Sequence, residues 1–380
     1  MSLRLKVMTV VGTRPEIIRL APTMKLLDRT TNHVLVHTGQ NYDYELNGVF
    51  FEDLGLRRPD HFLAADTSSL GATLGSILTK TEVVLREEKP DAFLVLGDTN
   101  SCVSAVMAKR LHVPVFHMEA GNRSFDENVP EETNRRLIDH VADYNLVYTE
   151  HARENLLREG IHPSRILLTG SPMREVLAQN QSYIDSSDVL ARQGLVANGY
   201  FLVSLHREEN VDYPRRLAEA LESLQSVRDE YGIPVLISTH PRTRQRLEAL
   251  SDDLKGGLVF HPPFGFNDYV KLQQNARLVL SDSGTIAEES SILGFPAITL
   301  RDFIERPEAV DAGSIITAGL EPGSVLAAVA ITLQLPRPIS PVDYQVTDTS
   351  QRVVSFIIGV THSHTRRLGL FCQENSRAPQ

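Results

Sequence analysis

Three carboxylic acids lie close together in the first half of the chain, each next to a run that reads as a buried strand or a helix start. Asp98 follows AFLVLG, Glu119 follows VPVFHM, and Glu131 lies at the start of the helical pattern PEETNRR. In an open α/β sheet, ligands bind in the crevice beyond the carboxyl ends of the strands, so acids there face a ligand and not the core. The three acids therefore predict proton-transfer chemistry at one edge of a sheet.

Two other strand ends carry groups suited to an anion. Gly12–Glu16 connects the first strand to a helix, and Arg14 can reach an anionic group over that helix start, although an ordinary strand-to-helix turn explains the same residues. Ser281–Thr285 (SDSGT) precedes a helix that contains Glu288 and Glu289. Hydroxyls and free N–H groups at a helix start form an anion nest, and a carboxylate one turn later can bind ribose hydroxyls.

The simpler interpretation of SDSGT is a capped helix with Ser283 as its N-cap. Function is favoured because Glu305-Arg306-Pro307-Glu308 follows another strand of the same half. His206 and His240 also follow strands there, where a histidine can hold a phosphate or shuttle a proton. Each could instead be a hydrogen-bonded structural histidine, and the functional interpretation is favoured for His206 more than for His240.

A required metal is not expected. His117, Glu119, Asp98 and His206 are possible ligands by type, and carboxylates at strand ends also suit Mg²⁺. However, the sequence contains no HxxxH or HExxH pair and uses no cysteine at these positions.

Length and composition indicate a globular protein with more than one domain. The 380 residues suit two domains of roughly 150–200 residues each. The formal charge of −10 argues against a nucleic-acid or anionic-membrane partner, which usually meets a basic face. Two distant cysteines, no signal peptide and no apolar run of about 18 residues predict a cytoplasmic enzyme without disulfides.

Short β-branched runs alternate with helical patterns such as Leu70–Glu88 along the whole chain. Such alternation predicts parallel sheets with helices on both faces. The expected fold class is α/β, with two doubly wound Rossmann-like domains that face each other across a cleft. We place the first domain at residues 1–171, the second at 172–346, a final helix at about 347–361, and a partly disordered tail at 362–380.

In this order, the motifs resemble those of the non-hydrolysing UDP-N-acetylglucosamine 2-epimerase family. The resemblance covers almost all of residues 5–320 and rests on VGTRPEIIRLAP, HTGQ, LVLGDTNS, HMEAGNR, VPEETNRR, NLLREGI, TGSP, SLHREEN, STHPR, LSDSGTIAEESSILGFP and RDFIERPEAVDAG. It implies a fold like that of the GT-B glycosyltransferases, with the last helix crossing back to the first domain. It also implies a homodimer and a UDP-sugar substrate, with no cofactor such as NAD or PLP.

The reaction that the resemblance implies is elimination of UDP across C1–C2 of the sugar, which gives a 2-acetamidoglucal, followed by re-addition with C2 inverted. Such a reaction needs a base, an acid, and cationic or N–H groups for the departing diphosphate. The alternatives are a GT-B glycosyltransferase that uses a UDP-sugar, a hydrolysing epimerase, and a non-catalytic nucleotide-sugar sensor.

The resemblance assigns roles residue by residue. It implies that Asp98, Glu119 and Glu131 are the catalytic acids and that Arg14 and His206 contact the diphosphate. His206 is also counted as a catalytic candidate because of its place at a strand end in the cleft. The residues expected to bind UDP or substrate are Arg14, Arg19, His240, Ser283, Gly284, Thr285, Glu289 and Arg306.

Three departures from the common family pattern stand out. Arg19 replaces a lysine, Thr285 replaces the second glycine of the phosphate loop, and Gln40-Asn41-Tyr42 replaces Gln-His-Arg. The last change puts in doubt the activation by a second UDP-GlcNAc that the typical bacterial enzyme shows. These variants look like the subgroup that makes UDP-N-acetyl-L-fucosamine from UDP-2-acetamido-2,6-dideoxy-L-talose, so the sequence favours that sugar over UDP-GlcNAc.

Overall fold

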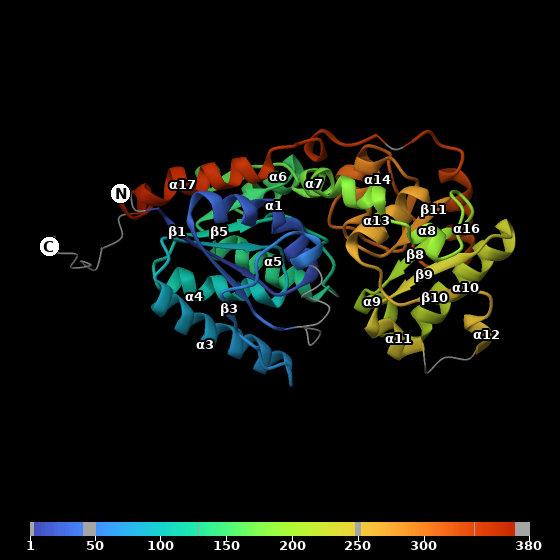
Figure 1. Cartoon of the computed structure of the whole chain (residues 1–380), viewed down its shortest axis with the longest axis horizontal. Helices are drawn as coiled ribbons and strands as arrows, with labels where there is room; N and C mark the ends of the chain where they lie inside the picture. Colours follow the sequence, from blue (N-terminus) through green and yellow to red (C-terminus); the bar gives the residue numbers. More distant parts are fainter. Residues whose placement is uncertain (1–3, 41–50, 128, 248–251, 338, 369–380) are drawn as a thin grey trace.

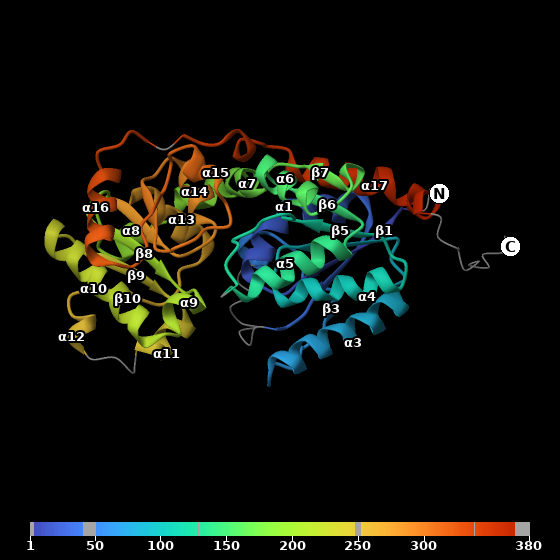
Figure 2. The ribbon, with the colours of Figure 1, turned by 180° about the vertical axis from the view of Figure 1, so that it is seen from behind.

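Two parallel β-sheets form two lobes that lie side by side (Figures 1 and 2). The computed structural model describes residues 4–40, 51–127, 129–247, 252–337 and 339–368. Within these residues the first sheet has seven strands in the order β3-β2-β1-β4-β5-β6-β7, and the second has six in the order β10-β9-β8-β11-β12-β13. Both are the doubly wound arrangement that the alternating sequence pattern predicts, and the fold is GT-B-like.

The first lobe is built from the first half of the chain. Its strands are β1 (Lys6–Val11), β2 (Asn32–His37), β3 (His61–Phe62), β4 (Ala92–Leu96), β5 (Val115–Met118), β6 (Tyr144–Val147) and β7 (Ile166–Leu168). Its longer helices are α1 (Arg14–Thr30), α3 (Leu70–Glu88), α4 (Ser104–Arg110), α5 (Pro130–Val141), α6 (Glu150–Arg158) and α7 (Met173–Ser186).

The second lobe repeats the same plan. Its strands are β8 (Phe201–Leu205), β9 (Val235–Thr239), β10 (Val259–His261), β11 (Leu278–Ser281), β12 (Ala297–Thr299) and β13 (Ile316–Thr317). Its helices are α8 (Val189–Arg192), α9 (Glu208–Val211), α10 (Pro214–Tyr231), α11 (Pro241–Leu247), α12 (Asp252–Lys255), α13 (Phe266–Asn275), α14 (Ile286–Leu293), α15 (Glu308–Asp311) and α16 (Pro322–Thr332).

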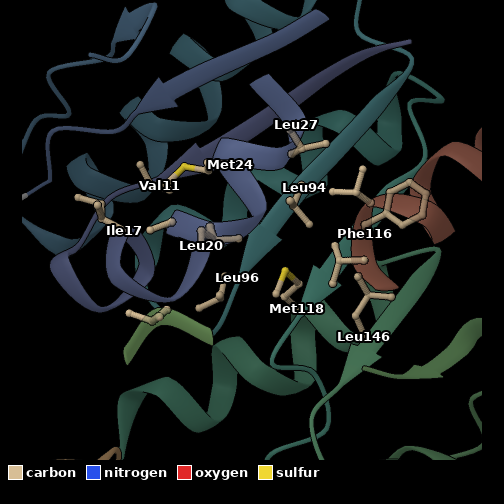
Figure 3. Close-up of a cluster of buried hydrophobic side chains, with 14 of the residues drawn as sticks. Val11, Ile17, Leu20, Met24, Leu27, Leu94, Leu96, Phe116, Met118 and Leu146 are labelled. Atoms are coloured by element: carbon tan, nitrogen blue, oxygen red, sulfur yellow. The ribbon is translucent and has the colours of Figure 1, made fainter. Parts of the chain in front are cut away.

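Helix α1 shows how the sequence fixes this packing. Thr13 is at the N-cap position, where its backbone N–H donates to the Glu16 carboxylate at 3.1 Å, and a proline occupies the first turn, where its missing N–H costs nothing. Ile17, Leu20 and Met24 follow at helical spacing and are fully buried. Figure 3 shows these side chains against Leu94, Leu96, Phe116 and Met118 of the central strands. This packing holds the β1–α1 turn, and with it Arg14, at the carboxyl edge of the first sheet.

The last helix, α17 (Thr349–Leu368), packs against α1 on the first lobe, after the chain has crossed back from the second lobe (Figure 1). Its buried residues Val353, Val354 and Ile357 belong to the same core cluster as Leu20. The helix continues past residue 361, so residues 362–368 of the expected tail are helical. Residues 369–380 lie outside the described part of the chain.

Helix α7 differs from the expected organisation. It begins two residues beyond the proposed boundary at 171 and continues to Ser186, into the polar stretch at 179–188 that reads from the sequence as a pause between the domains. Its apolar face, with Met173, Val176 and Leu177, joins the core of the first lobe, while the helix also contacts α13 of the second lobe. The polar stretch is therefore the exposed side of a helix between the lobes, and the packing of the first lobe extends to Ser186.

The polar edges of the two sheets are placed by their topology. In each sheet the chain reverses its winding direction between two adjacent strands, which are β1 and β4 in the first lobe and β8 and β11 in the second. Ligands of doubly wound sheets bind at this switch point, beyond the carboxyl ends of the strands. Asp98 follows β4 and Ser283 follows β11, so both switch points carry residues predicted to be functional.

Candidate active site

The three acids occupy the carboxyl edge of the first sheet, as predicted. Asp98 lies two residues beyond β4, Glu119 directly follows β5, and Glu131 is the second residue of α5. All three line one cavity between the lobes, of about 280 Å³. Glu119 has a φ of +64°, a left-handed conformation that is uncommon for a residue other than glycine. Such backbone strain is typical of functional positions.

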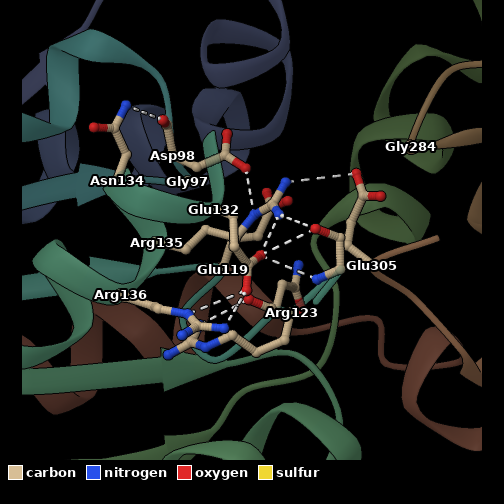
Figure 4. Close-up of polar contacts among 12 residues, drawn as sticks. Gly97, Asp98, Glu119, Arg123, Glu132, Asn134, Arg135, Arg136, Gly284 and Glu305 are labelled. Atoms are coloured by element: carbon tan, nitrogen blue, oxygen red, sulfur yellow. Dashed lines mark hydrogen bonds and ion pairs between the residues drawn. The ribbon is translucent and has the colours of Figure 1, made fainter. Parts of the chain in front are cut away.

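Asp98 and Glu131 have different surroundings. The Asp98 carboxylate forms an ion pair with Arg135, whose Nε lies 2.7 Å away (Figure 4). Burial, together with the neighbouring Asp98 charge, raises the pKa of Glu131 above its ordinary value. A raised pKa lets a carboxyl group retain a proton, so Glu131 is suited to donate one.

Glu119 lies between two arginines that come from different lobes. One carboxylate oxygen bonds Arg19 of α1, and the other bonds Arg306 of the second lobe. Burial alone would raise the pKa of Glu119, but the two guanidinium charges outweigh it and hold the pKa below its ordinary value.

The facing wall begins with His206, directly after β8. Its ring Nδ1 lies 3.0 Å from a carboxylate oxygen of Asp282, which is fully buried. The backbone N–H groups of His206 and Arg207 also donate to Asp282, at 2.9–3.1 Å. The buried acid thus fixes the orientation of the imidazole of His206, which lines the acid-lined cavity.

The Ser283-Gly284-Thr285 loop forms the start of α14. The helix begins at Ile286 with Thr285 at the N-cap position, two residues after the Ser283 that the simpler interpretation names. The Ser283 hydroxyl nevertheless accepts a hydrogen bond from the Thr285 backbone N–H at 3.3 Å, and it lies 2.9 Å from the Thr285 hydroxyl. A Cβ added at Gly284 would come within 2.5 Å of Glu305, which explains the glycine.

A second cavity, of about 370 Å³, adjoins the acid-lined one. The two share six residues, which are Pro15, Arg19, His206, His240, Ser283 and Thr285. Phe264, Phe266, Tyr269 and Val270 give the second cavity an apolar side. Glu289 lines it too, and the amide of Gln273 holds the Glu289 carboxylate at 2.6 Å.

The predicted site residues thus divide between the two cavities. The acid-lined cavity contains Asp98, Glu119, Glu131, Gly284 and Arg306. Arg14 and Glu289 line the apolar cavity and not the acid-lined one. Of the Gln40-Asn41-Tyr42 segment, Asn41 and Tyr42 lie outside the described residues. Among the residues that the structure describes, no group of three or more His, Cys, Asp or Glu could hold a metal ion, and no helix is long and apolar enough to cross a membrane.

Sequence reasoning missed the charges that hold the walls together. Glu305 is almost fully buried and accepts a hydrogen bond from Arg207 at 2.9 Å and one from Arg301. Arg135 of the first lobe lies 3.8 Å from the same carboxylate (Figure 4). No local pattern signals these contacts, because Arg301 and Glu305 lie in the loop between β12 and α15 and the other partners come from other elements.

The helix that carries Glu131 also differs from expectation. The position of Glu132 in the first turn predicts only a favourable interaction with the helix N-terminus, but Glu132 is buried and pairs with Arg135 at 2.9 Å. Helical spacing predicts that Arg136 and Asp139 form a surface or interface network, but Asp139 is fully buried and contacts His117 at 2.9 Å. The other ring nitrogen of His117 lies 2.8 Å from the Gly97 carbonyl, so this histidine supports the Asp98 loop.

A family model described as UDP-N-acetylglucosamine 2-epimerase matches residues 25–358. The chain belongs to this family. It is 39% identical to the UDP-N-acetylglucosamine 2-epimerase of Methanocaldococcus jannaschii, over 88% of this chain and 93% of that protein. It is 36% identical to the UDP-2,3-diacetamido-2,3-dideoxy-D-glucuronate 2-epimerase of Pseudomonas aeruginosa, over 83% and 88%. The protein is therefore an isomerase, as the motifs indicated.

Solved structures confirm the fold of this epimerase. The UDP-N-acetylglucosamine 2-epimerase of Rickettsia bellii is 45% identical, with a TM-score of 0.91 over 97% of this chain and 100% of that one. The M. jannaschii enzyme in complex with UDP-GlcNAc and UDP is 38% identical, with a TM-score of 0.89 over 93% and 100%. A trehalose 6-phosphate synthase from Burkholderia multivorans, 13% identical, covers 99% of each chain with a TM-score of 0.57 and shares the fold alone.

Proposed function

We propose that this epimerase inverts C2 of a UDP-2-acetamido sugar by eliminating UDP and adding it back. The observation that carries the proposal is the pair of joined cavities: carboxylates line the wall from the first lobe, and hydroxyls, His206 and a helix start line the wall from the second. One wall is suited to moving a proton at carbon, and the other to holding the diphosphate that leaves.

The lining of the cavities supports an orientation for the nucleotide. The apolar cavity suits a uracil ring against Phe264 and Tyr269, with Glu289 accepting hydrogen bonds from the ribose. The Ser283–Thr285 loop and His206 lie where the cavities meet, which suits the diphosphate. The sugar then extends toward Asp98 and Glu131.

The chemistry follows from that orientation. A base takes the proton from C2. The electron pair of the broken C2–H bond forms the C1–C2 double bond, and the C1–O bond breaks as UDP leaves with its electron pair. Addition of UDP back to C1, with a proton delivered to the other face of C2, completes the inversion. Asp98, Glu119 and Glu131 supply the base and the acid, and the raised pKa of Glu131 suits it to donate.

Two sugars are candidates. The relatives named UDP-N-acetylglucosamine 2-epimerase favour UDP-GlcNAc, as does the complex of the M. jannaschii enzyme with UDP-GlcNAc. The sequence variants Arg19, Thr285 and Gln40-Asn41-Tyr42 favour the 6-deoxy-L-talose derivative, and Arg19 and Thr285 line both cavities. A turnover assay with each UDP-sugar, with the products identified by NMR, decides between them. Release of free sugar in place of its UDP-linked epimer would contradict the non-hydrolysing reaction.

Glu289→Ala will raise KM for the UDP-sugar about tenfold and leave kcat within about threefold, because the lost contact binds ground state and transition state alike. Steady-state kinetics measure both constants. Glu230→Ala, on the exposed side of α10, serves as the control and leaves both unchanged. A loss confined to kcat would contradict the ribose role.

The homodimer that the family resemblance implies is part of the proposal. Light scattering of the purified protein measures its mass directly, and the expected value is twice that of the 42.3 kDa chain.

A further inference from the structure

The contacts of Glu119 connect the two lobes. Arg19 on α1 and Arg306 in the second lobe each bond one oxygen of its carboxylate. The Glu119 side chain is 10% exposed, and those of the two arginines are 4% and 7% exposed. A buried carboxylate held by two guanidinium groups is a strong, charge-assisted arrangement. In the free protein, Glu119 therefore neutralises the two arginines that line the acid-lined cavity beside the phosphate loop.

The terminal nitrogens of both arginines are already engaged. Arg306 uses one for the Gly284 carbonyl of the phosphate loop and the other for Glu119. Arg19 uses one for Glu119, and its other terminal nitrogen lies 3.5 Å from Glu288. A diphosphate that binds at this loop meets guanidinium groups that another anion has already neutralised.

We propose that UDP binds by exchanging counter-ions: its diphosphate takes Arg306 and Arg19 from Glu119, and the displaced Glu119 carboxylate takes up a proton. This inference rests on the proposed function, since it places the diphosphate at the Ser283–Thr285 loop. It gives Glu119 a role in binding that differs from those of Asp98 and Glu131. Until the nucleotide binds, the Glu119 carboxylate balances the positive charges of Arg19 and Arg306.

Proton uptake follows from the charges around Glu119. The groups that face it are the cations Arg19, Arg306 and Arg135, together with Glu288 and the Tyr148 hydroxyl. Once the diphosphate neutralises the two bonded cations, burial and the Glu288 charge both raise the pKa of the Glu119 carboxyl group, and of the facing cations only Arg135 still lowers it. Glu119 then becomes a group that can carry a proton to the sugar.

The test is calorimetric titration of the full-length protein with UDP at pH 6.5, in two buffers of different ionisation enthalpy. Wild type is expected to take up a fraction of a proton on binding UDP. Glu119→Gln removes the competing anion, so it is expected to bind UDP about tenfold tighter and to take up less proton. Glu131→Gln removes a second carboxyl group of the same cavity without freeing either arginine, and its affinity for UDP is expected to change less than about threefold.

Two other titratable groups face the diphosphate or its arginines, and His206→Gln and Glu288→Gln cover them. Glu288 lies 3.5 Å from Arg19, and burial raises its pKa to about 7, so proton uptake must persist in both variants at saturating UDP. Equal or weaker UDP binding by Glu119→Gln, an equal gain in Glu131→Gln, or loss of the uptake in either of these two variants overturns the exchange. The proposed function survives those outcomes as long as wild type binds UDP and epimerises the sugar. Failure of wild type to bind UDP is a failure of the proposed function itself.

Discussion

Asp98→Asn and Glu131→Gln will each lower kcat by about 10²–10⁴-fold, the usual cost of removing a general acid or base. Both substitutions keep the shape of the side chain and remove its ability to exchange a proton. Neither residue lines the apolar cavity assigned to the nucleoside, so UDP affinity is expected to stay within about threefold of wild type. Steady-state turnover and equilibrium titration with UDP measure the two quantities separately.

Glu127→Gln is the matched control, because Glu127 is an exposed acid four residues before Glu131 and does not line the cavity. Its kcat should equal that of wild type. If Asp98→Asn or Glu131→Gln retained full turnover, proton transfer would have to be assigned to another group. If turnover and UDP binding fell together, the acids would be structural.

Glu305→Gln will lower the free energy of unfolding by about 3 kcal/mol, which is the usual cost of removing one partner of a buried ion pair. The substitution removes the one negative charge shared by Arg207, Arg301 and Arg135. Chemical denaturation at pH 7 measures the loss. Glu82→Gln removes the partner of Arg86 in an exposed pair on α3, where the loss should stay below about 1 kcal/mol. Equal losses in the two variants would contradict this account of the charge network.

The Glu305 contribution also has a defined pH dependence. Burial would raise the pKa of this carboxyl, but the guanidinium groups of Arg207, Arg301 and Arg135 hold it well below its ordinary value of 4.5. A carboxyl group whose pKa is lower in the folded protein than in the unfolded chain adds to the free energy of unfolding. This contribution is complete above the pKa of the unfolded chain and is lost as the pH falls toward the pKa of the folded protein. The difference between wild type and Glu305→Gln should therefore be constant near neutral pH and shrink below pH 4.5. A difference that grows on acidification would contradict this.

The sequence was sufficient for the strands and for the acids at their ends, because both follow from local patterns. Runs such as AFLVL are buried on both faces of a parallel sheet, and the residue type just beyond them is informative. The edge strands β3 and β13 escaped detection because two residues carry no periodicity. Helix α7 was misplaced because its exposed side reads as a polar linker.

The pairing of charges could not be predicted. Glu119 and Arg306 are separated by 187 residues, and only the packing of one lobe on the other brings them together. Glu305 likewise takes partners from three segments of the chain. Sequence spacing reports only neighbours on one helix or strand, so it could not reveal the contacts between the lobes.

The central claim is that these acids move a proton at C2 while UDP leaves C1. Incubation of the enzyme with its UDP-sugar in D₂O, followed by NMR of the recovered nucleotide sugar, tests this claim most directly. The account predicts that deuterium replaces hydrogen at C2 of the epimerised sugar and at no other carbon, and that Asp98→Asn slows the exchange together with turnover. Epimerised product that keeps its original C2 hydrogen would contradict it.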